Sequence, residues 1–212
     1  MQRTWHHHGR HLTGLGVAGA ITWWAFGLQR PVPFLDWFDL AVHEAGHMLA
    51  MPLPRIAMFM AGSFLQVALP LAFAWYFGVA RRDRLAGGFC LAWAGTSAWD
   101  VSVYAGDAVT MRLPLVGGGE HDWAYILGHF DALHLTDRVA AGIRWGGLAI
   151  SMLGLAVILW SWLREVRQAE AGSRVPDRSQ PFDSGVEDPW LAAASLPFHH
   201  DRSRTQSGSS VG

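Results

Sequence analysis

The sequence predicts an all-α protein: a polytopic membrane helix bundle of about five transmembrane helices, followed by a disordered C-terminal tail. Hydrophobic residues make up 51% of the 212 residues and charged residues only 16%, against ~25% in ordinary soluble domains. Residues 12–29 and 56–80 contain no charged residue, and residues 139–163 contain only Arg144. Runs of this length cross a bilayer core of about 30 Å as helices and are too long for barrel strands.

The N-terminal third is predicted to hold one membrane helix and one shorter helix. Residues 1–11 are polar and form a solvated N-terminal segment. Residues 12–29 form the first membrane helix rather than a cleavable signal peptide, because Arg30-Pro31-Val32-Pro33 follows in place of a small-residue cleavage site. Residues 34–51 form a shorter helix, which Pro52-Leu53-Pro54 ends.

The remainder alternates apolar helices with polar turns. Residues 56–80 form a membrane helix, the charged loop 81–84 follows, and residues 85–106 are apolar except for Asp100. Apolar side chains at helical spacing predict a short interfacial helix over residues 123–133. Thr136-Asp137 is typical of a helix start, and residues 139–163 form the last span. The polar composition of residues 166–212 predicts a disordered tail, which leaves residues 12–165 as the membrane-embedded domain.

Arginine distribution predicts the orientation. With five spans, the 30–33 loop, the 81–84 loop and the start of the tail share one side of the membrane. That side carries the densest group of arginines, at positions 81, 82 and 84, which favours it as cytoplasmic and puts the N-terminus outside. The overall net charge of −1 gives no reason to expect nucleic acid as a partner.

The motif H-E-x-x-H occurs at residues 43–47, inside the short helix. Positions i and i+4 share a helix face, so His43 and His47 can direct their imidazoles at one metal ion. Glu44, beside the first histidine, can take a proton from a water that the metal polarises. Between residues 40 and 54 these three are the only ionisable side chains. Because charged groups in an apolar helix are costly without compensation, the setting favours metal binding. Gly46 would let another backbone or a substrate approach closely.

A catalytic metal site needs a third protein ligand, and the sequence offers several. At about 1.5 Å per residue, His47 lies roughly 18–20 Å from the 30–33 side and Asp100 roughly 18–24 Å, so the two can meet. Asp107, two turns further along the same face, is the second candidate. Alternatively, either aspartate caps a helix or pairs with an arginine. A rival pair is His121 with Asp122, after the glycines at 117–119; alternatively, these residues are only the polar start of the interfacial helix. The single Cys90 excludes a cysteine-based zinc site and an intramolecular disulfide.

The sequence His43-Glu44-Ala45-Gly46-His47 in an apolar helix resembles the site-2 protease family of intramembrane zinc metallopeptidases. The resemblance implies that His43 and His47 bind Zn²⁺, that Glu44 is the general base, and that an aspartate from a later helix, Asp100 or Asp107, completes the site. It also implies a site facing the cytoplasmic half. Residues 62–66 are similar to the glycine-rich stretch of small bacterial relatives. Neither Asp100 nor Asp107 lies in the Leu-Asp-Gly sequence usual in that family.

The expected function is therefore that of a zinc-dependent metalloendopeptidase in a bacterial cytoplasmic membrane, as a multi-pass integral protein. Its partners would be the lipid bilayer and a membrane-embedded or juxtamembrane protein or peptide substrate. Two alternatives share the motif. One is a non-enzymatic membrane protein that uses a His/Asp metal site for transport or sensing, and the other is an inactive protease homologue. Metal stoichiometry and peptide cleavage distinguish them.

Overall fold

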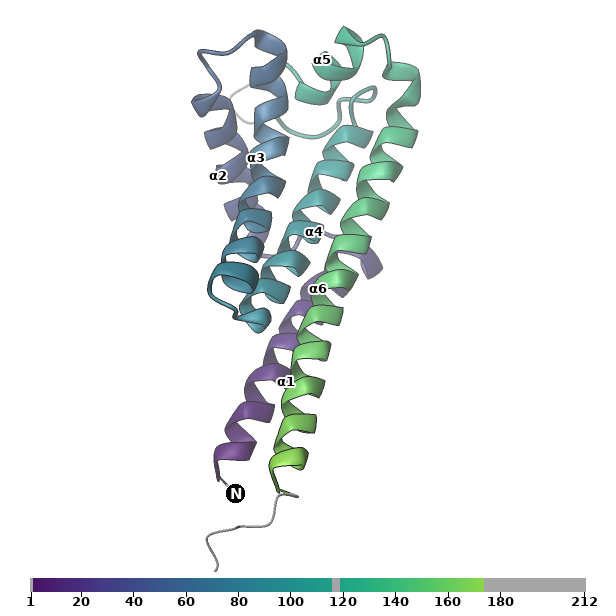
Figure 1. The fold of residues 1–212 in the computed structure, drawn as a ribbon. Coiled ribbons are helices and arrows are strands. Elements are labelled where there is room, and N and C mark those ends of the chain that lie inside the picture. Colours follow the sequence, from purple (N-terminus) through teal and green to yellow (C-terminus); the bar gives the residue numbers. More distant parts are fainter. Residues whose placement is uncertain (1, 116–118, 174–212) are drawn as a thin grey trace, which may run out of the picture. The chain divides into compact units, whose positions relative to one another are not determined.

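The computed structural model describes residues 2–115 and 119–173, and every regular element within them is helical (Figure 1). The helices are α1 (Gln2–Thr22), α2 (Leu35–Leu49), α3 (Arg55–Trp75), α4 (Arg84–Gly106), α5 (Asp122–His129) and α6 (Thr136–Ser173). Short helical turns follow α1 (η1, Trp23–Gly27), α3 (η2, Tyr76–Ala80) and α5 (η4, Leu133–Leu135). The chain divides into residues 1–170, which hold the helix bundle, and residues 171–212. The all-α prediction is confirmed for the described residues.

Helix α4 is the most buried helix and packs against α1, α3 and α6. Ala18 of α1, Ala92 of α4 and Ile158 of α6 form one fully buried cluster. Glycines let α6 approach α4 closely, because a β-carbon at Gly147 would lie 2.7 Å from the Gly95 carbonyl oxygen. Ser151 of α6 also donates a hydrogen bond to the Ala92 carbonyl at 3.1 Å. Small residues at such crossings replace side-chain bulk by close backbone packing.

Helix α2, which carries the H-E-x-x-H motif, is fixed against two neighbours. Asp39 is 1% exposed and accepts hydrogen bonds from Trp93 Nε1 at 2.9 Å and Ser97 Oγ at 2.7 Å, both on α4. At Gly46 the helix crosses α3 so closely that a β-carbon would clash with the Ala61 carbonyl oxygen and lie 2.9 Å from the Gly62 Cα. The close approach predicted for Gly46 is confirmed. These contacts set the height and rotation of the two motif histidines.

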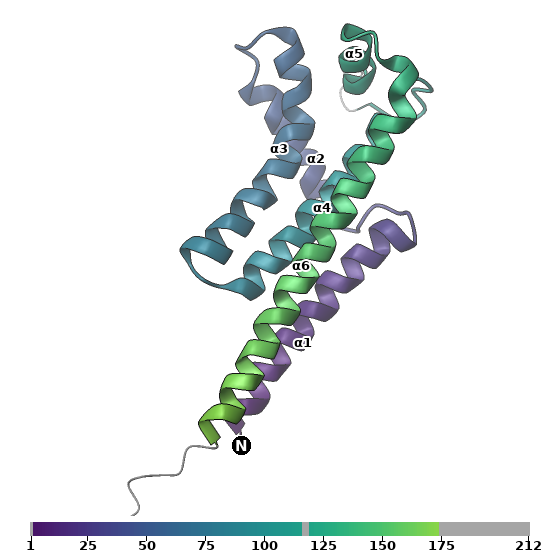
Figure 2. The same ribbon diagram turned by 45° about the vertical axis from the view of Figure 1, so that its right-hand side comes forward.

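The predicted alternation of helix direction is wrong at the N-terminal end of the chain. Arg10 and His11 line a cavity together with residues 81–85 and residues of α6 near Arg164, so the start of α1 lies beside the 81–84 turn. Val32 instead packs on Trp99, well along α4. Helices α1 and α2 therefore run in the same general direction, one after the other (Figures 1 and 2). Residues 28–34 connect α1 to α2 without reversing the direction of the chain. The pattern of charges in the sequence does not show this.

Two helical segments of the described chain are long and apolar enough to cross a membrane, Arg55–Ala80 and Leu133–Ala171. They correspond to two of the predicted spans. Helix α6 begins at Thr136 as predicted, but it continues to Ser173, so residues 166–173 are helical rather than part of the tail. Residues 2–11 are likewise helical. The predicted tail from residue 174 onward lies outside the described residues.

Candidate metal centre

The two motif histidines lie on one face of α2, as their spacing predicts, with ring centroids 4.8 Å apart. Each ring is held through its Nδ1 atom. His43 Nδ1 lies 3.1 Å from Gln66 Oε1 on α3, and His47 Nδ1 lies 2.8 Å from the backbone carbonyl oxygen of Met58. Because these oxygens accept hydrogen bonds, each Nδ1 carries a proton and each Nε2 faces the site. Oriented imidazoles of this kind are the usual metal ligands in proteins.

The carboxylate that meets the histidines is Asp122, the first residue of α5. Its Oδ2 atom lies 2.9 Å from His43 Nε2 and 3.0 Å from His47 Nε2. The three ligand atoms lie within 4.8 Å of one another, and no other group of three or more such side chains exists in the described part of the chain. The structure therefore brings together His43, His47 and Asp122, a group that could hold a metal ion. We call these three residues the metal-ligand cluster.

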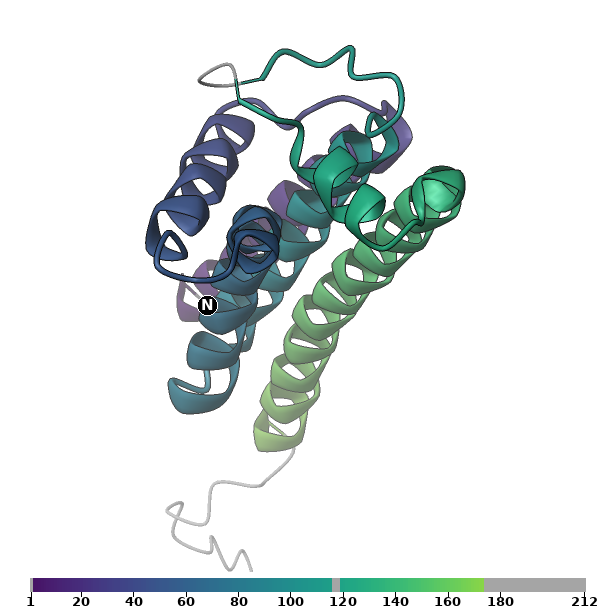
Figure 3. The same cartoon turned by 90° about the horizontal axis from the view of Figure 1, so that it is seen from above.

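Helix α5 packs on α3, and this packing places Asp122 next to the two histidines. Trp123 Nε1 donates a hydrogen bond to Ser63 Oγ at 3.1 Å, and the rings of Phe59 and Tyr125 stack with centroids 4.3 Å apart. Arg55 forms an ion pair with Glu120 at 2.6 Å. Figure 3, viewed from this end, shows α5 between the ends of α3 and α6. The predicted short helix therefore exists over 122–129, and its contacts aim Asp122 at α2.

The hydrogen bonds of the two histidines favour a cation between these groups. His47 faces an acceptor on both sides, the Met58 carbonyl at Nδ1 and the Asp122 carboxylate at Nε2. His43 has the same arrangement with Gln66 and Asp122. A neutral imidazole carries only one N–H group, so it satisfies only one of its two acceptors. A metal ion that binds both Nε2 atoms and the Asp122 carboxylate satisfies these three groups. It does so without requiring two imidazolium ions in a buried site.

The electrostatics of Asp122 agree with a ligand role. Burial of this carboxyl group opposes its ionisation, but in the metal-free site hydrogen bonds from protonated Nε2 atoms of His43 and His47 outweigh burial and hold the pKa of Asp122 below its ordinary value. The group is therefore a carboxylate at neutral pH. Ligand atoms about 2.0–2.1 Å from a tetrahedral ion lie roughly 3.3–3.4 Å apart. The two Nε2–Oδ2 distances of 2.9 and 3.0 Å are a few tenths of an ångström shorter, a difference that small side-chain rotations remove.

Glu44 lies half-buried on the wall of a cavity of about 640 Å³ that the three cluster residues also line. Within the described part of the chain its carboxylate has no hydrogen-bond partner, so it is available to a molecule in the cavity. Tyr104 lines the same cavity, and its hydroxyl accepts a hydrogen bond from the Asp122 backbone N–H at 3.2 Å. An ionisable carboxylate beside three convergent ligand atoms is the arrangement that metal-assisted hydrolysis needs.

The structure does not bring Asp100 or Asp107 to the histidines. Asp100 lines the same cavity, as does Asp36 at the start of α2, but it is not among the clustered ligands. Because α2 begins beside Trp99 rather than at the level of the 81–84 turn, its histidines lie beyond Asp100, and Tyr104 is the α4 residue that reaches His43, at 5.8 Å between ring centroids. The predicted depth of the histidines relative to Asp100 was therefore wrong.

Asp107 holds the loop that follows α4. It accepts hydrogen bonds from the backbone N–H groups of Arg112 at 3.0 Å and Leu113 at 2.8 Å, and from the Thr110 hydroxyl. These hydrogen bonds hold the pKa of Asp107 below its ordinary value in spite of burial. The side chain of Asp107 therefore neither caps a described helix nor pairs with a described arginine side chain, and its carboxylate shapes the loop that directly follows α4.

The rival pair His121 and Asp122 is separated by the fold. His121 Nδ1 accepts a hydrogen bond from the Ala124 N–H at 3.3 Å, which caps α5. Its Nε2 atom lies 3.7 Å from Asp107 Oδ2, and His121 is not among the residues of the metal-ligand cluster. Only the aspartate of the pair reaches the histidines. The signal in the sequence was a carboxylate at the first position of an amphipathic helix, next to a polar loop with glycines.

Comparisons of the chain with protein-family models, with curated proteins and with solved structures found no match. The function of the site is therefore inferred from its own geometry.

Gly62 is predicted to be required for metal binding. A β-carbon at this position of α3 would lie 2.6 Å from His43 Nε2 and 2.5 Å from His47 Nε2, closer than unbonded atoms approach. We expect Gly62→Ala to lower metal affinity by about 10- to 100-fold, because overpacking of about 1–3 kcal/mol would displace the ligand atoms. Isothermal titration calorimetry of apoprotein with zinc measures this. Gly142→Ala, where a β-carbon meets nothing within 4 Å, is the matched control, and an equal loss in both variants would contradict the explanation.

Proposed function

We propose that this protein is a zinc-dependent intramembrane endopeptidase that hydrolyses a peptide bond in a membrane-embedded or juxtamembrane substrate. The observation that carries the proposal is the convergence of His43, His47 and Asp122 on a cavity that Glu44 also lines. Two imidazoles, one carboxylate and one further carboxylate beside them are the residue types that zinc peptidases use. The resemblance of residues 43–47 to the site-2 protease family agrees with this chemistry.

Zinc bound by the three ligands would supply Lewis-acid chemistry at the scissile carbonyl. The residues of the chain supply the rest. Gln66 and the Met58 carbonyl hold the Nδ1 protons and so keep both Nε2 atoms directed at the site. Glu44 takes a proton from the attacking water as the carbon–oxygen bond forms. It then returns that proton to the amine nitrogen as the carbon–nitrogen bond breaks.

We place this chemistry in a multi-pass integral membrane protein of the bacterial cytoplasmic membrane. Two helical segments meet the length and hydropathy of a membrane span. Large apolar side chains are also exposed outside those two segments, among them Trp23 (66%), Trp37 (73%) and Leu49 (73%). Exposed apolar surface on this scale favours lipid as the surrounding medium. A helical substrate would have to unwind locally to present a carbonyl to the cavity.

The arginines bear on which side the site opens. Arg10, Arg81 and Arg164 lie around one cavity, whereas Arg55 lies beside Glu120 near the metal-ligand cluster. The positive-inside rule therefore favours the end opposite the cluster as cytoplasmic. On this basis the site opens away from the cytoplasm, unlike the placement that the family resemblance implies.

Metal analysis and cleavage on one preparation test the proposal. Wild-type protein, purified in detergent and dialysed, is expected to retain about one zinc ion per chain, and His43→Ala well below one, because two ligands do not hold a catalytic ion. Reconstituted wild type is expected to cleave a membrane-inserted test peptide, and His43→Ala is not. Stoichiometric zinc without cleavage would favour the inactive homologue. Weak, exchangeable metal binding would favour the transport or sensing alternative.

A further inference from the structure

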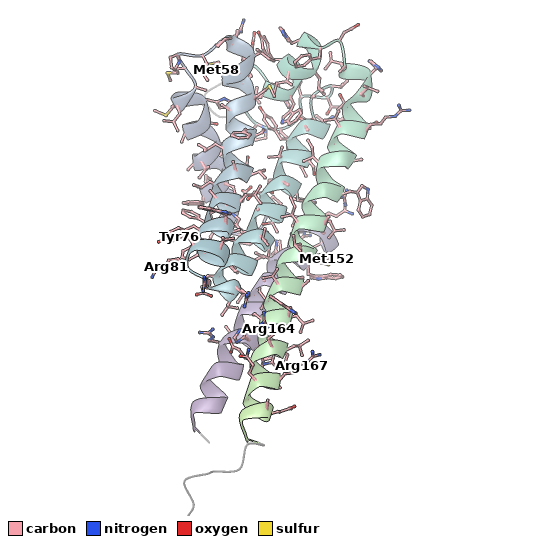
Figure 4. The ribbon with its side chains drawn as sticks, viewed as in Figure 1. Met58, Tyr76, Arg81, Met152, Arg164 and Arg167 are labelled. Carbon is pink, nitrogen blue, oxygen red and sulfur yellow. The ribbon has the colours of Figure 1, made fainter. Side chains whose placement is uncertain are left out.

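A second cavity, of about 350 Å³, lies among α1, the turn after η2, the start of α4 and the end of α6. Its lining is strongly basic. Five arginines and two carboxylates contribute to it, an excess of three positive charges: Arg10, Arg81, Arg82, Arg84, Arg164, Asp83 and Glu165. Figure 4 shows Arg81 and Arg164 toward the end of the bundle away from Met58. The cavity shares no lining residue with the metal-ligand cluster.

The two carboxylates of the cavity already have partners. Glu165 lies 3.5 Å from Arg10 and 3.6 Å from His11. Asp83 caps α4 and accepts a hydrogen bond from the Ala86 N–H at 3.1 Å. Among the described residues, none forms an ion pair with the remaining four arginines of the cavity: Arg81, Arg82, Arg84 and Arg164. The positive charge of this cavity is therefore left for a ligand to neutralise.

Trp160 forms cation–π contacts with two of these arginines. The guanidinium carbons of Arg84 and Arg164 each lie 4.8 Å from the centre of its indole ring. Cation–π contacts hold each side chain in place, and both arginines also line the cavity. An anion in the cavity would therefore meet two guanidinium groups that Trp160 already holds in place. Planar guanidinium groups fit the oxygens of a phosphate in a two-point contact better than other cationic side chains do.

The cavity lies where phospholipid headgroups would be found. Arg81 directly follows the candidate span that ends at Ala80, and Arg164 directly follows the apolar run 139–163 of α6. Trp160, 49% exposed, is of the type enriched at this level of a bilayer. Basic pockets between membrane helices on the cytoplasmic side bind anionic lipid headgroups. We propose that this cavity binds the phosphate group of an anionic phospholipid, with Arg84 and Arg164 as its main contacts.

Native mass spectrometry of the full-length protein in a neutral detergent tests the proposal. The probes are phosphatidylglycerol, phosphatidylcholine and inorganic phosphate. We expect wild type to retain phosphatidylglycerol in preference to phosphatidylcholine. Arg84→Gln/Arg164→Gln should weaken phosphatidylglycerol binding roughly 10- to 30-fold. The matched control Arg138→Gln/Arg167→Gln removes the same charge from α6 at residues that do not line the cavity, and it should bind as wild type does.

Each contrary outcome overturns the proposal. If Arg138→Gln/Arg167→Gln lost as much phosphatidylglycerol binding as Arg84→Gln/Arg164→Gln, the loss would be explained by net charge alone. Inorganic phosphate that binds with the same arginine dependence and displaces the lipid would make free phosphate the ligand. Arg81→Gln/Arg82→Gln, at exposed turn positions, tests the cavity without disturbing Trp160 and should also weaken binding. The readout depends on a membrane location but not on zinc or peptidase activity, so it can fail while the proposed chemistry holds.

Discussion

Asp122→Ala is expected to empty the metal centre. Its Oδ2 atom is the only carboxylate oxygen within 3.0 Å of both histidine Nε2 atoms among the described residues. Without it two imidazoles remain, which is too few protein ligands for a catalytic zinc site. We expect zinc to fall from about one ion per purified chain to a level near that of His43→Ala, and peptide cleavage to be lost with it. Plasma mass spectrometry of dialysed protein measures the metal.

Asp100→Ala tests whether the third ligand is Asp122, as the structure indicates, or Asp100, as the sequence predicts. Asp100 lines the cavity, yet it is not one of the clustered ligands. We therefore expect Asp100→Ala to keep its zinc. If Asp100→Ala lost zinc while Asp122→Ala kept it, Asp122 would not be the third ligand and the prediction from helix depth would be right. Asp107→Ala is a poorer control, because it would also loosen the loop before Asp122.

Glu44→Gln is expected to keep the metal and abolish cleavage. The amide is the same size as the carboxylate but cannot take a proton from water. General bases of this kind contribute about 10²- to 10⁴-fold to the rate. Because Glu44 is not one of the clustered ligands, zinc content should equal that of wild type. Cleavage of a membrane-inserted peptide, with zinc measured on the same sample, gives both numbers.

Glu120→Gln is the matched control for this effect. It makes the same chemical change at another carboxylate that lines the cavity, but that carboxylate pairs with Arg55 and is 58% exposed. Exposed ion pairs contribute little to stability, so we expect near-normal cleavage. Wild-type rates in Glu44→Gln would refute the role of Glu44 as base. Loss of zinc in Glu44→Gln would instead show that the substitution disturbs the ligands.

Local pattern was sufficient for the motif and for most of the helices. Residues i and i+4 share a face on any helix, so His43 and His47 had to point the same way. The charge-free run 56–80 and the nearly charge-free run 139–163 correspond to α3 with η2 and to α6. The sequence also identified Gly46 as a point of close approach, because only a residue without a β-carbon fits there. Each of these predictions depends on neighbours within a few turns of one helix.

The third member of the cluster depends on contacts between distant segments. Asp122 reaches the histidines because Trp123 and Tyr125 dock α5 onto α3 and Tyr104 holds the Asp122 backbone. None of these contacts leaves a periodic signal in the sequence. Asp100 was favoured because hydropathy shows which segments are apolar but not which way each one runs, and α2 continues in the direction of α1. Helical spacing was enough to show which two side chains of one helix can share a metal ion. The carboxylate that completes the site was selected by the packing of α5 on α3, which no local pattern encodes.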